Sequence, residues 1–327
     1  MSPVQPRVSF VIPVKNDAAR LRRCLETINA NRYTPGIEAV VVDNGSTDDS
    51  VRVARAAGAR ILSLPSQSVA ELRNRGAQVA TGDVLVFVDA DHEIVEDWVA
   101  CAVETLRHGR NVGAVGAMCM APEKGNWVQR TYDLLRRRSN AIHDVEWLGS
   151  GNMAVLRRAF ELVGGFDTRL QTCEDVDLCR RLRRHGFRIV NDPRLRNVHL
   201  GDPASLRDLF RGELWRGRDN LRVSLRAPFA WRDLPSIVIP IADVMLVAVA
   251  MVALGTRSTM GVAMAILSAG AIAGASALRA ARMVRQSEQL TPLGCAQAFA
   301  VAAVYDAARA MALVRPGGHE ARRKQSA

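Results

Sequence analysis

Short apolar runs alternate with amphipathic stretches through roughly the first 110 residues of this 327-residue chain, and no other feature restricts its fold as strongly. The runs are rich in β-branched residues, which is typical of parallel strands buried on both faces. The stretches between them carry apolar residues at helical spacing. The pattern therefore predicts an α/β fold with a doubly wound, mostly parallel sheet. The expected strands are 8–14, 39–42, 59–64 and 84–88, and the expected helices are 17–29, 50–57, 69–80 and 96–107.

The alternation is less regular after residue 110, but residues 1–202 still fit one α/β domain. A helix is expected at 127–138, and a second, highly charged one at 175–185. Further strands are expected at 112–120, 147–156, 187–190 and 197–200.

The composition changes after Pro203. Residues 203–233 are rich in arginine with interspersed leucine and aromatic residues, which is typical of a basic amphipathic segment at a membrane surface. Two long apolar runs follow, at 237–254 and 260–278, each close to the roughly 20 residues that a spanning helix needs. They predict a transmembrane hairpin at 234–280, with a pair of buried soluble helices as the alternative. Gly270 and Gly274 have a spacing that would let the two helices approach closely.

Arginines indicate the orientation of this hairpin. Those near its ends are Arg222, Arg226 and Arg232 before the first run and Arg279, Arg282 and Arg285 after the second, whereas only Arg257 lies in the turn between the runs. The positive-inside rule then keeps both ends of the hairpin, and the large N-terminal domain, on the cytoplasmic side of the inner membrane. The remaining tail, 281–327, contains a third apolar run at 295–314. Because Asp306 and Arg309 interrupt it, we expect it to lie in the interface rather than to span the membrane.

The charge bears on nucleic-acid binding, and the cysteines bear on the redox environment of the protein. The net charge is +11, but aromatic residues make up only 5% and do not cluster with the basic ones, which disfavours a nucleic-acid-binding surface. The six cysteines include no CxxC pair. They predict free, mostly buried thiols in a reducing environment.

Polar side chains follow the expected strands at the edge where parallel sheets bind ligands. Pro13, Val14 and Asn16 close the first strand, Asp43 ends the second, and Asp89-Ala90-Asp91 ends the fourth. Two carboxylates separated by one residue can both reach Mg²⁺ or Mn²⁺, whose shell is commonly completed by substrate phosphates. Arg73, in the helix before the fourth strand, is placed to help neutralise a diphosphate.

Two further features lie downstream. Glu174, Asp175 and Asp177 open a helix, where acidic residues also serve simply to favour the helix dipole. His199 ends a short strand, and a lone histidine is as readily a structural residue. The residues alone do not decide between a structural and a functional role for either feature.

The order of the motifs resembles the family 2 glycosyltransferases with the GT-A fold, over roughly residues 7–201. The chain contains VSFVIPVKN, VVDNGSTDDS and ELRNRGAQVATGDVLVFVDADHE, followed by GSGNMAVLRRAF, VGGFD, CEDVDLCRRLRRHGFRI and NVHLG. The resemblance implies a nucleotide-diphosphate sugar as donor, and a pocket for it lined by Pro13, Val14, Asn16, Asp43, Arg73 and Asp89.

The resemblance also implies the roles of the acidic groups. Asp91 matches the better metal ligand of the DxD pair, with Asp89 nearer the sugar or ribose, and His199 is similar in position to a histidine that completes the metal site in some members. Asp175 looks like the catalytic base. Repulsion from Glu174 and Asp177 is expected to raise the pKa of Asp175.

One motif of the family is missing. The Gln-x-x-Arg-Trp sequence of processive members does not occur, which favours transfer of one sugar per event. We therefore expect an inverting, metal-dependent enzyme that acts on a hydroxyl acceptor, lipid-linked or a precursor of a cell-surface polysaccharide. A nucleotidyltransferase or dehydrogenase is disfavoured because no glycine-rich loop follows the first strand. The remaining alternative is a non-catalytic, membrane-anchored module that binds a nucleotide sugar.

Overall fold

The computed structural model describes residues 5–33, 36–137, 139–226, 234–286 and 291–314, which group into two compact units. An α/β unit comprises the described residues of 1–122 and 138–202, and a helical unit comprises those of 123–137 and 203–327. The expected boundary after residue 202 coincides with this division, whereas 123–137 group with the helical unit rather than with the α/β domain. Of the expected interfacial segment, 227–233 lie outside the described residues, as do 287–290 and 315–327 of the expected tail.

An eight-stranded sheet forms the α/β unit in the order β3-β2-β1-β4-β8-β6-β9-β7. The first four strands in this order are parallel, and β8 runs antiparallel to both of its neighbours. The predicted mostly parallel α/β sheet is therefore confirmed. The strands are β1 (Val8–Val14), β2 (Ile37–Asp43), β3 (Arg60–Ser63), β4 (Val84–Val88), β6 (Val112–Gly116), β7 (His143–Asp144), β8 (Asn152–Leu156) and β9 (Arg188–Asn191).

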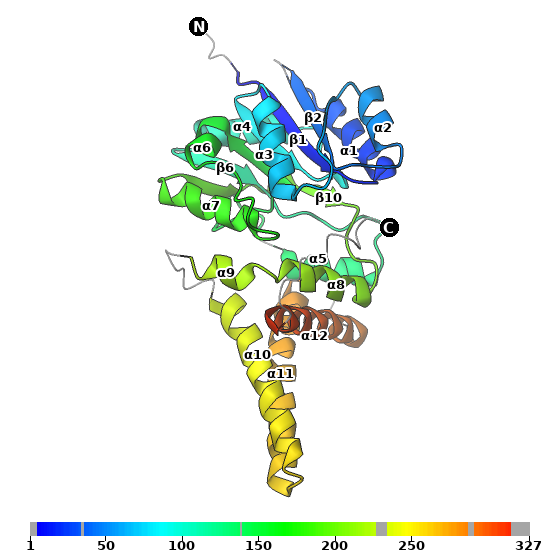
Figure 1. Ribbon diagram of the computed structural model, residues 1–327, viewed down its shortest axis with the longest axis vertical. Coiled ribbons are helices and arrows are strands. Elements are labelled where there is room, and N and C mark those ends of the chain that lie inside the picture. Colours follow the sequence, from blue (N-terminus) through cyan, green and yellow to red (C-terminus); the bar gives the residue numbers. More distant parts are fainter. Residues whose placement is uncertain (1–4, 34–35, 138, 227–233, 287–290, 315–327) are drawn as a thin grey trace. The chain divides into compact units, whose positions relative to one another are not determined.

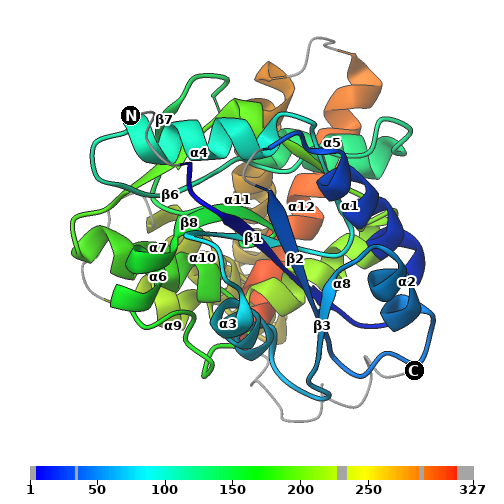
Figure 2. The ribbon, with the colours of Figure 1, turned by 90° about the horizontal axis from the view of Figure 1, so that it is seen from above.

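Helices cover both faces of this sheet because the side chains of its central strands, which alternate between the two faces, are apolar on both. Phe10, Ile12 and Val86 pack on one face, while Val11 and Phe87 pack on the other. The first face is covered by α1 (Ala18–Ala30), α2 (Ser50–Ala56) and α4 (Trp98–His108), and the second by α3 (Val69–Val79), α6 (Arg157–Leu162) and α7 (Glu174–Arg184) (Figure 2).

A second, two-stranded sheet pairs β5 (His92–Ile94) with β10 (Asn197–His199) in antiparallel fashion. A short 3₁₀ helix, Pro193–Leu195, precedes β10. The sequence did not predict β5. The strand expected at 112–120 is shorter than predicted, since β6 ends at Gly116 and Met120 forms only a single bridge with Val198.

The helical unit contains a long hairpin of α10 (Leu234–Gly255) and α11 (Thr259–Arg285) (Figure 1). Ser258 caps α11 by accepting a hydrogen bond from the Gly261 amide at 3.0 Å. Both helices, and α12 (Pro292–Val314), are long and apolar enough to cross a membrane. The predicted close approach through Gly270 and Gly274 is wrong, because a Cβ atom built on either meets no described atom within 4 Å.

The unit contains three further helices, two of which pack against α12. They are α5 (Trp127–Arg136), α8 (Leu206–Arg216) and α9 (Asn220–Ser224), of which α5 and α8 contact α12 directly. Figure 1 shows α12 lying across one end of the hairpin rather than alongside it. Buried ion pairs fix this arrangement: Arg279 on α11 binds Asp306 at 2.8 Å, and Arg309 binds Glu213 on α8 at 2.9 Å.

None of the six cysteines forms a disulfide bond, as predicted, but they are not mostly buried. Cys24 and Cys179 are buried, Cys295 is exposed, and Cys101, Cys119 and Cys173 are half-buried.

Candidate functional site

The ends of β1 and β2 form one edge of the site. Val14 and Asp43 are register partners, so both strands end at the same level. Asp43 is buried, and its carboxylate accepts hydrogen bonds from the amides of Gly45 and Ser46 at 3.2 and 3.0 Å. Asn16 has a left-handed backbone, with φ of 51°, and its side chain accepts from the Thr47 amide at 2.7 Å. The two turns thereby hold each other in place.

The first-strand residues differ in what they present to this edge. Val14 packs its side chain into the core, and its carbonyl accepts a hydrogen bond from the Asn44 amide at 2.8 Å. Pro13 is half-buried and Asn16 is exposed.

Arg73 connects the acidic group that follows β4 to the acidic start of α7. Its guanidinium donates to Asp89 at 2.6 Å and to Glu174 at 2.7 Å. The arginine is buried, and its Nε has no hydrogen-bond partner among the described residues. One carboxylate oxygen of Asp89 is therefore already bound by Arg73. The expected role of Asp89 as a metal ligand stays a prediction.

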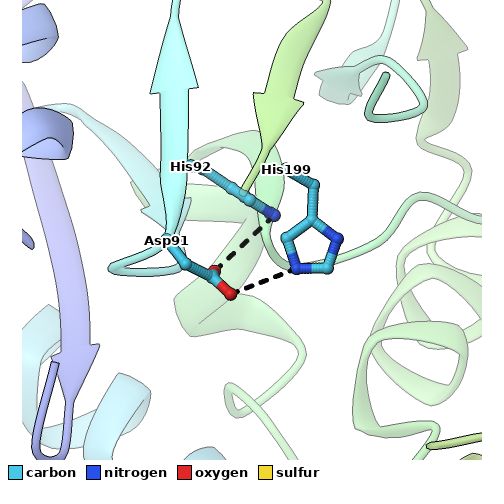
Figure 3. Close-up of side chains that lie close together, drawn as sticks. All are labelled: Asp91, His92 and His199. Atoms are coloured by element: carbon cyan, nitrogen blue, oxygen red, sulfur yellow. Dashed lines mark ion pairs between the residues drawn. The ribbon is translucent and has the colours of Figure 1, made fainter. Parts of the chain in front are cut away.

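Asp91, His92 and His199 form a cluster that could hold a metal ion (Figure 3). Their ligand atoms lie within 4.8 Å of one another. His199 Nε2 is 3.2 Å from Asp91 Oδ2, and His92 Nε2 is 4.0 Å from Asp91 Oδ1. The two imidazole rings meet edge to face at 4.6 Å, since His92 and His199 are direct register partners of β5 and β10. Asp91 and His199 were predicted, and His92 was missed.

The second ring nitrogen of each histidine is already engaged. His92 Nδ1 bonds to the carbonyl of Gly151, and His199 Nδ1 bonds to the buried carboxylate of Asp202 at 2.7 Å. Each acceptor favours a proton on Nδ1, so Nε2, which faces Asp91, is the nitrogen available to a metal ion or to a second proton. Metal-binding histidines have this arrangement, in which a carbonyl or carboxylate orients the ring. The residues therefore fit a divalent ion with two imidazoles and one carboxylate.

Charge is balanced within this cluster. Burial opposes ionisation of His199, but its hydrogen bonds to Asp202 and Asp91 outweigh burial and raise its pKa to about 9. Burial likewise opposes the charge on Asp91, yet the hydrogen bond and charge of His199 hold the pKa of Asp91 below its usual range. A cation at this position is thus favoured by the surroundings, whether it is a proton on His199 or a metal ion.

Asp175 lies in the first turn of α7, next to Glu174 and facing the loop before β8. Its carboxylate accepts from the amide of Val176 at 2.8 Å and from that of Ser150 at 3.2 Å. The pKa of Asp175 is raised, and burial is the largest cause. The predicted cause, repulsion from Glu174 and Asp177, is therefore not the dominant one, and Asp177 pairs with Arg181 at 2.8 Å. A raised pKa suits a carboxylate that must accept a proton near neutral pH.

Two glycines allow the backbone to approach the cluster closely. A Cβ atom on Gly151 would collide with the His92 ring and lie 2.8 Å from Asp89 Oδ2. A Cβ atom on Gly201 would collide with the Asp91 carboxylate. The GSGN and HLG motifs thus have a steric reason for their glycines, which the sequence alone did not reveal.

The chain is similar in sequence to known glycosyltransferases. Residues 9–162 match the model of the family described as glycosyl transferase family 2. The glycosyltransferase AglE of Haloferax volcanii is 27% identical over 247 residues, which cover 70% of this chain and 80% of that protein. The O-antigen biosynthesis protein RfbC of Myxococcus xanthus is 28% identical over 222 residues, but these cover 59% of this chain and only 17% of that much longer protein.

A solved structure shares the fold. The mannosyltransferase PcManGT of Pyrobaculum calidifontis, in complex with GDP-Man and Mn²⁺, superimposes with a TM-score of 0.58 at 20% sequence identity, covering 92% of this chain and 86% of that one. Residues 9–162 carry the glycosyl transferase family 2 match, and the α/β unit has the GT-A fold of glycosyltransferases.

Proposed function

We propose that this chain is an inverting, metal-dependent glycosyltransferase that moves one sugar per event from a nucleotide-diphosphate sugar to a hydroxyl group. The observation that carries the proposal is the link through Arg73 between Asp89 and Glu174, next to Asp175. It keeps the donor-side carboxylate and the carboxylate suited to be the base in one site.

Asp175 is the proposed catalytic base. It takes the proton of the acceptor hydroxyl while that oxygen attacks the anomeric carbon from the face opposite the leaving diphosphate. One displacement of this kind inverts the anomeric configuration. The amides of Val176 and Ser150 orient the carboxylate, and its raised pKa supports proton uptake.

The donor side is proposed to comprise the turns that contain Asn16 and Asp43, together with Asp89 and Arg73. Asp91, His92 and His199 are the residues that would hold Mn²⁺ or Mg²⁺. Such an ion would supply positive charge beside the donor diphosphate. The complex of the Pyrobaculum mannosyltransferase with GDP-Man and Mn²⁺ supports this class of donor and ion. Arg73 donates a hydrogen bond to one oxygen of Asp89 and so fixes the orientation of this carboxylate. The second oxygen of Asp89 is then proposed to face the donor.

The acceptor is proposed to be lipid-linked or a polysaccharide precursor at the membrane. Three helices long and apolar enough to span a bilayer support this location. The arginines that flank the hairpin support an inner-membrane enzyme whose α/β unit faces the cytoplasm. The basic segment before α10, with exposed Arg207, Arg211 and Trp215 on α8, supports contact with the anionic headgroups.

The test begins with the purified full chain and a panel of UDP-, GDP- and dTDP-sugars, screened by thermal shift with Mn²⁺. The donor that stabilises the protein is then used for transfer to membrane lipid extracts, and the anomeric configuration of the product is read by NMR. Asp175→Asn should still bind the donor and lose transfer by about 100-fold or more, because it lacks the base. Asp91→Asn should lose both the Mn²⁺-dependent shift and transfer.

The matched control is Asp49→Asn, which changes an exposed carboxylate in the same group of loops. Among the described residues its ion-pair partner is Arg52. It should leave binding and transfer unchanged. Normal transfer by Asp175→Asn would refute its role as the base. Donor binding without transfer to any acceptor, in the wild type as in Asp175→Asn, would favour the non-catalytic module instead.

A further inference from the structure

Cys119 lies beside the histidine cluster, although it is distant from His92 and His199 in sequence. The segment that contains it continues alongside β10: the Met120 amide donates to the Asn197 carbonyl at 2.8 Å, and the His199 amide donates to the Met120 carbonyl at 2.9 Å. This pairing places Cys119 Sγ 3.9 Å from His92 Nε2. The thiol is half-buried, so it contacts the cluster and remains accessible.

His92 is the residue that joins the thiol to the cluster. Its side chain is only 3% exposed, and its Nδ1 is committed to the Gly151 carbonyl. Its Nε2 then faces Cys119 Sγ at 3.9 Å and Asp91 Oδ1 at 4.0 Å, with no closer partner among the described residues. The thiol is the hydrogen-bond partner of this nitrogen. A buried imidazole nitrogen between a thiol and a carboxylate also has the neighbours that a metal ligand needs.

The four donors match the preferences of one ion better than those of another. Mg²⁺ and Mn²⁺ favour oxygen ligands and have little affinity for a thiol. Zn²⁺ takes sulfur, nitrogen and carboxylate oxygen together, with tetrahedral bonds of about 2.0–2.3 Å that put neighbouring ligand atoms about 3.3–3.6 Å apart. The separations of 3.2, 3.9 and 4.0 Å require only small movements to reach this spacing. Cys119 Sγ is not among the ligand atoms that all lie within 4.8 Å of one another, so it must also move toward Asp91 and His199 when the ion binds.

We propose that Cys119 completes a four-donor Zn²⁺ site with Asp91, His92 and His199, and that Zn²⁺ bound there blocks the ion-dependent donor site. A tetrahedral ion with four protein ligands has no open position for a diphosphate. An ion that does not bind the thiol, such as Mn²⁺ or Mg²⁺, keeps open coordination positions, which the diphosphate of the sugar donor can occupy. This regulation rests on the proposed function, whereas the Zn²⁺ site itself does not.

The binding test uses metal-free full-length protein in detergent, without thiol reductants and without substrates. Co²⁺ serves as a spectroscopic substitute for Zn²⁺, and its complex should show a thiolate-to-cobalt charge-transfer band in the near ultraviolet. Cys119→Ser should lose this band. In competition with a chromogenic chelator, Cys119→Ser and Cys119→Ala should each bind Zn²⁺ about 10-fold more weakly or worse, comparable to the loss of other metal-site contacts. Their Mn²⁺ affinity, measured by electron paramagnetic resonance, should stay within about twofold of wild type.

The matched control is Cys101→Ser, which removes another half-buried thiol, on α4. It should keep the cobalt band and the Zn²⁺ affinity. A wild-type Co²⁺ complex without the band, or unchanged Zn²⁺ binding by both Cys119 variants, overturns the site. If the band appears, transfer assays decide the regulation: Zn²⁺ should inhibit the wild type at concentrations at least about 10-fold lower than those that inhibit Cys119→Ser. Equal inhibition of both would refute the regulation and leave the Zn²⁺ site standing.

Discussion

Arg73 is the buried cation on which two carboxylates of the site depend. Its side chain is 4% exposed and that of Glu174 is 8% exposed, so this pair is screened little by water. Removing one partner of such a pair typically costs about 3–5 kcal/mol, because it leaves a buried charge uncompensated. The planar guanidinium of arginine has several N–H donors that point in different directions, whereas the ammonium of lysine is a single compact charge. Only arginine can therefore bind Asp89 and Glu174 in this geometry.

Glu174 gives the site a stability that depends on pH. Burial and the charge of Asp175 outweigh Arg73 and raise the pKa of Glu174 to about 7. The folded state therefore holds this proton more tightly than the unfolded chain. The stability it contributes is fully present below the unfolded pKa of about 4.3 and is lost as the pH rises through about 7. The Tm of metal-free wild type should fall between pH 5 and 8 relative to that of Glu174→Gln, by a few degrees.

The measurement is a series of melting curves for both proteins across this pH range. Glu174→Gln also changes the partner of Arg73, so the slope of the difference in Tm against pH is compared, not its absolute value. Glu161→Gln, which alters an exposed glutamate on α6, should leave the slope at its wild-type value. A constant difference between wild type and Glu174→Gln would show that Glu174 does not take up a proton on folding.

The predicted residues and the missed ones differ in what defines them. Asp43, Asp89 and Asp91 follow apolar runs, so their place at the edge of the sheet could be read from the chain. His92 also follows such a run, but its part in the cluster depends on lying opposite His199 across a strand pair formed by segments more than 100 residues apart. No local pattern specifies that pairing.

The strand pair β5–β10 is the element that positions the histidines. Each strand has three residues, which is shorter than the patterns that identify strands in a sequence. The long strands β1 and β4 could be predicted with their exact bounds because their apolar runs coincide with them. The strand expected at 147–156 begins only at Asn152, because the preceding residues form the loop that carries Gly149 and Gly151.

That loop gives a matched pair of glycine variants within one motif. Gly151→Ala would place a methyl group against the His92 ring and 2.8 Å from Asp89 Oδ2. A methyl group on Gly149 would meet only Asp175 Oδ2, at 3.9 Å, which is ordinary contact. Gly151→Ala should weaken Mn²⁺ binding by about 10-fold or more, because it displaces a ring whose orientation supports the ion.

Electron paramagnetic resonance of free Mn²⁺ measures this affinity directly. Gly149→Ala should bind Mn²⁺ as the wild type does, and the far-ultraviolet circular dichroism of both variants should match that of wild type. Wild-type affinity in Gly151→Ala would mean that His92 is not held by this loop in the ion-bound protein.

At the scale of the whole molecule, the chain passes between its two units at 122–123, 137–138 and 202–203. The helix expected at 127–138 was placed in the α/β domain, whereas α5 groups with the helical unit. Its amphipathic pattern resembles that of any surface helix and does not show which unit it packs against. Its partners are distant in sequence: Tyr132 donates a hydrogen bond to Glu213 on α8 at 2.5 Å, and Glu213 also pairs with Arg309 on α12. Such a buried polar network cannot be identified from one helix alone.

The same network bears on the topology of α12 in the membrane. Asp306 and Arg309 are bound to α11 and α8, and α12 is the least apolar of the three long helices. A helix held in this way lies across the hairpin within its own unit (Figure 1). We therefore expect α12 to lie in the interface, so that the hairpin alone crosses the bilayer and both ends of the chain are cytoplasmic. The basic residues Arg322, Arg323 and Lys324 in the tail favour the same side.

Reporter fusions in a bacterial host test this topology. A green fluorescent protein fused after Ala327 should fluoresce, and alkaline phosphatase at the same position should be inactive, because the first matures in the cytoplasm and the second outside it. Phosphatase inserted after Arg257, in the hairpin turn, should be active and serves as the control for an external position. If α12 crosses the bilayer, the number of spans becomes odd and the C-terminal phosphatase becomes active while the C-terminal fluorescence is lost. That result would contradict the interfacial position of α12 and would require Asp306 and Arg309 to be accommodated within the bilayer as a paired polar site.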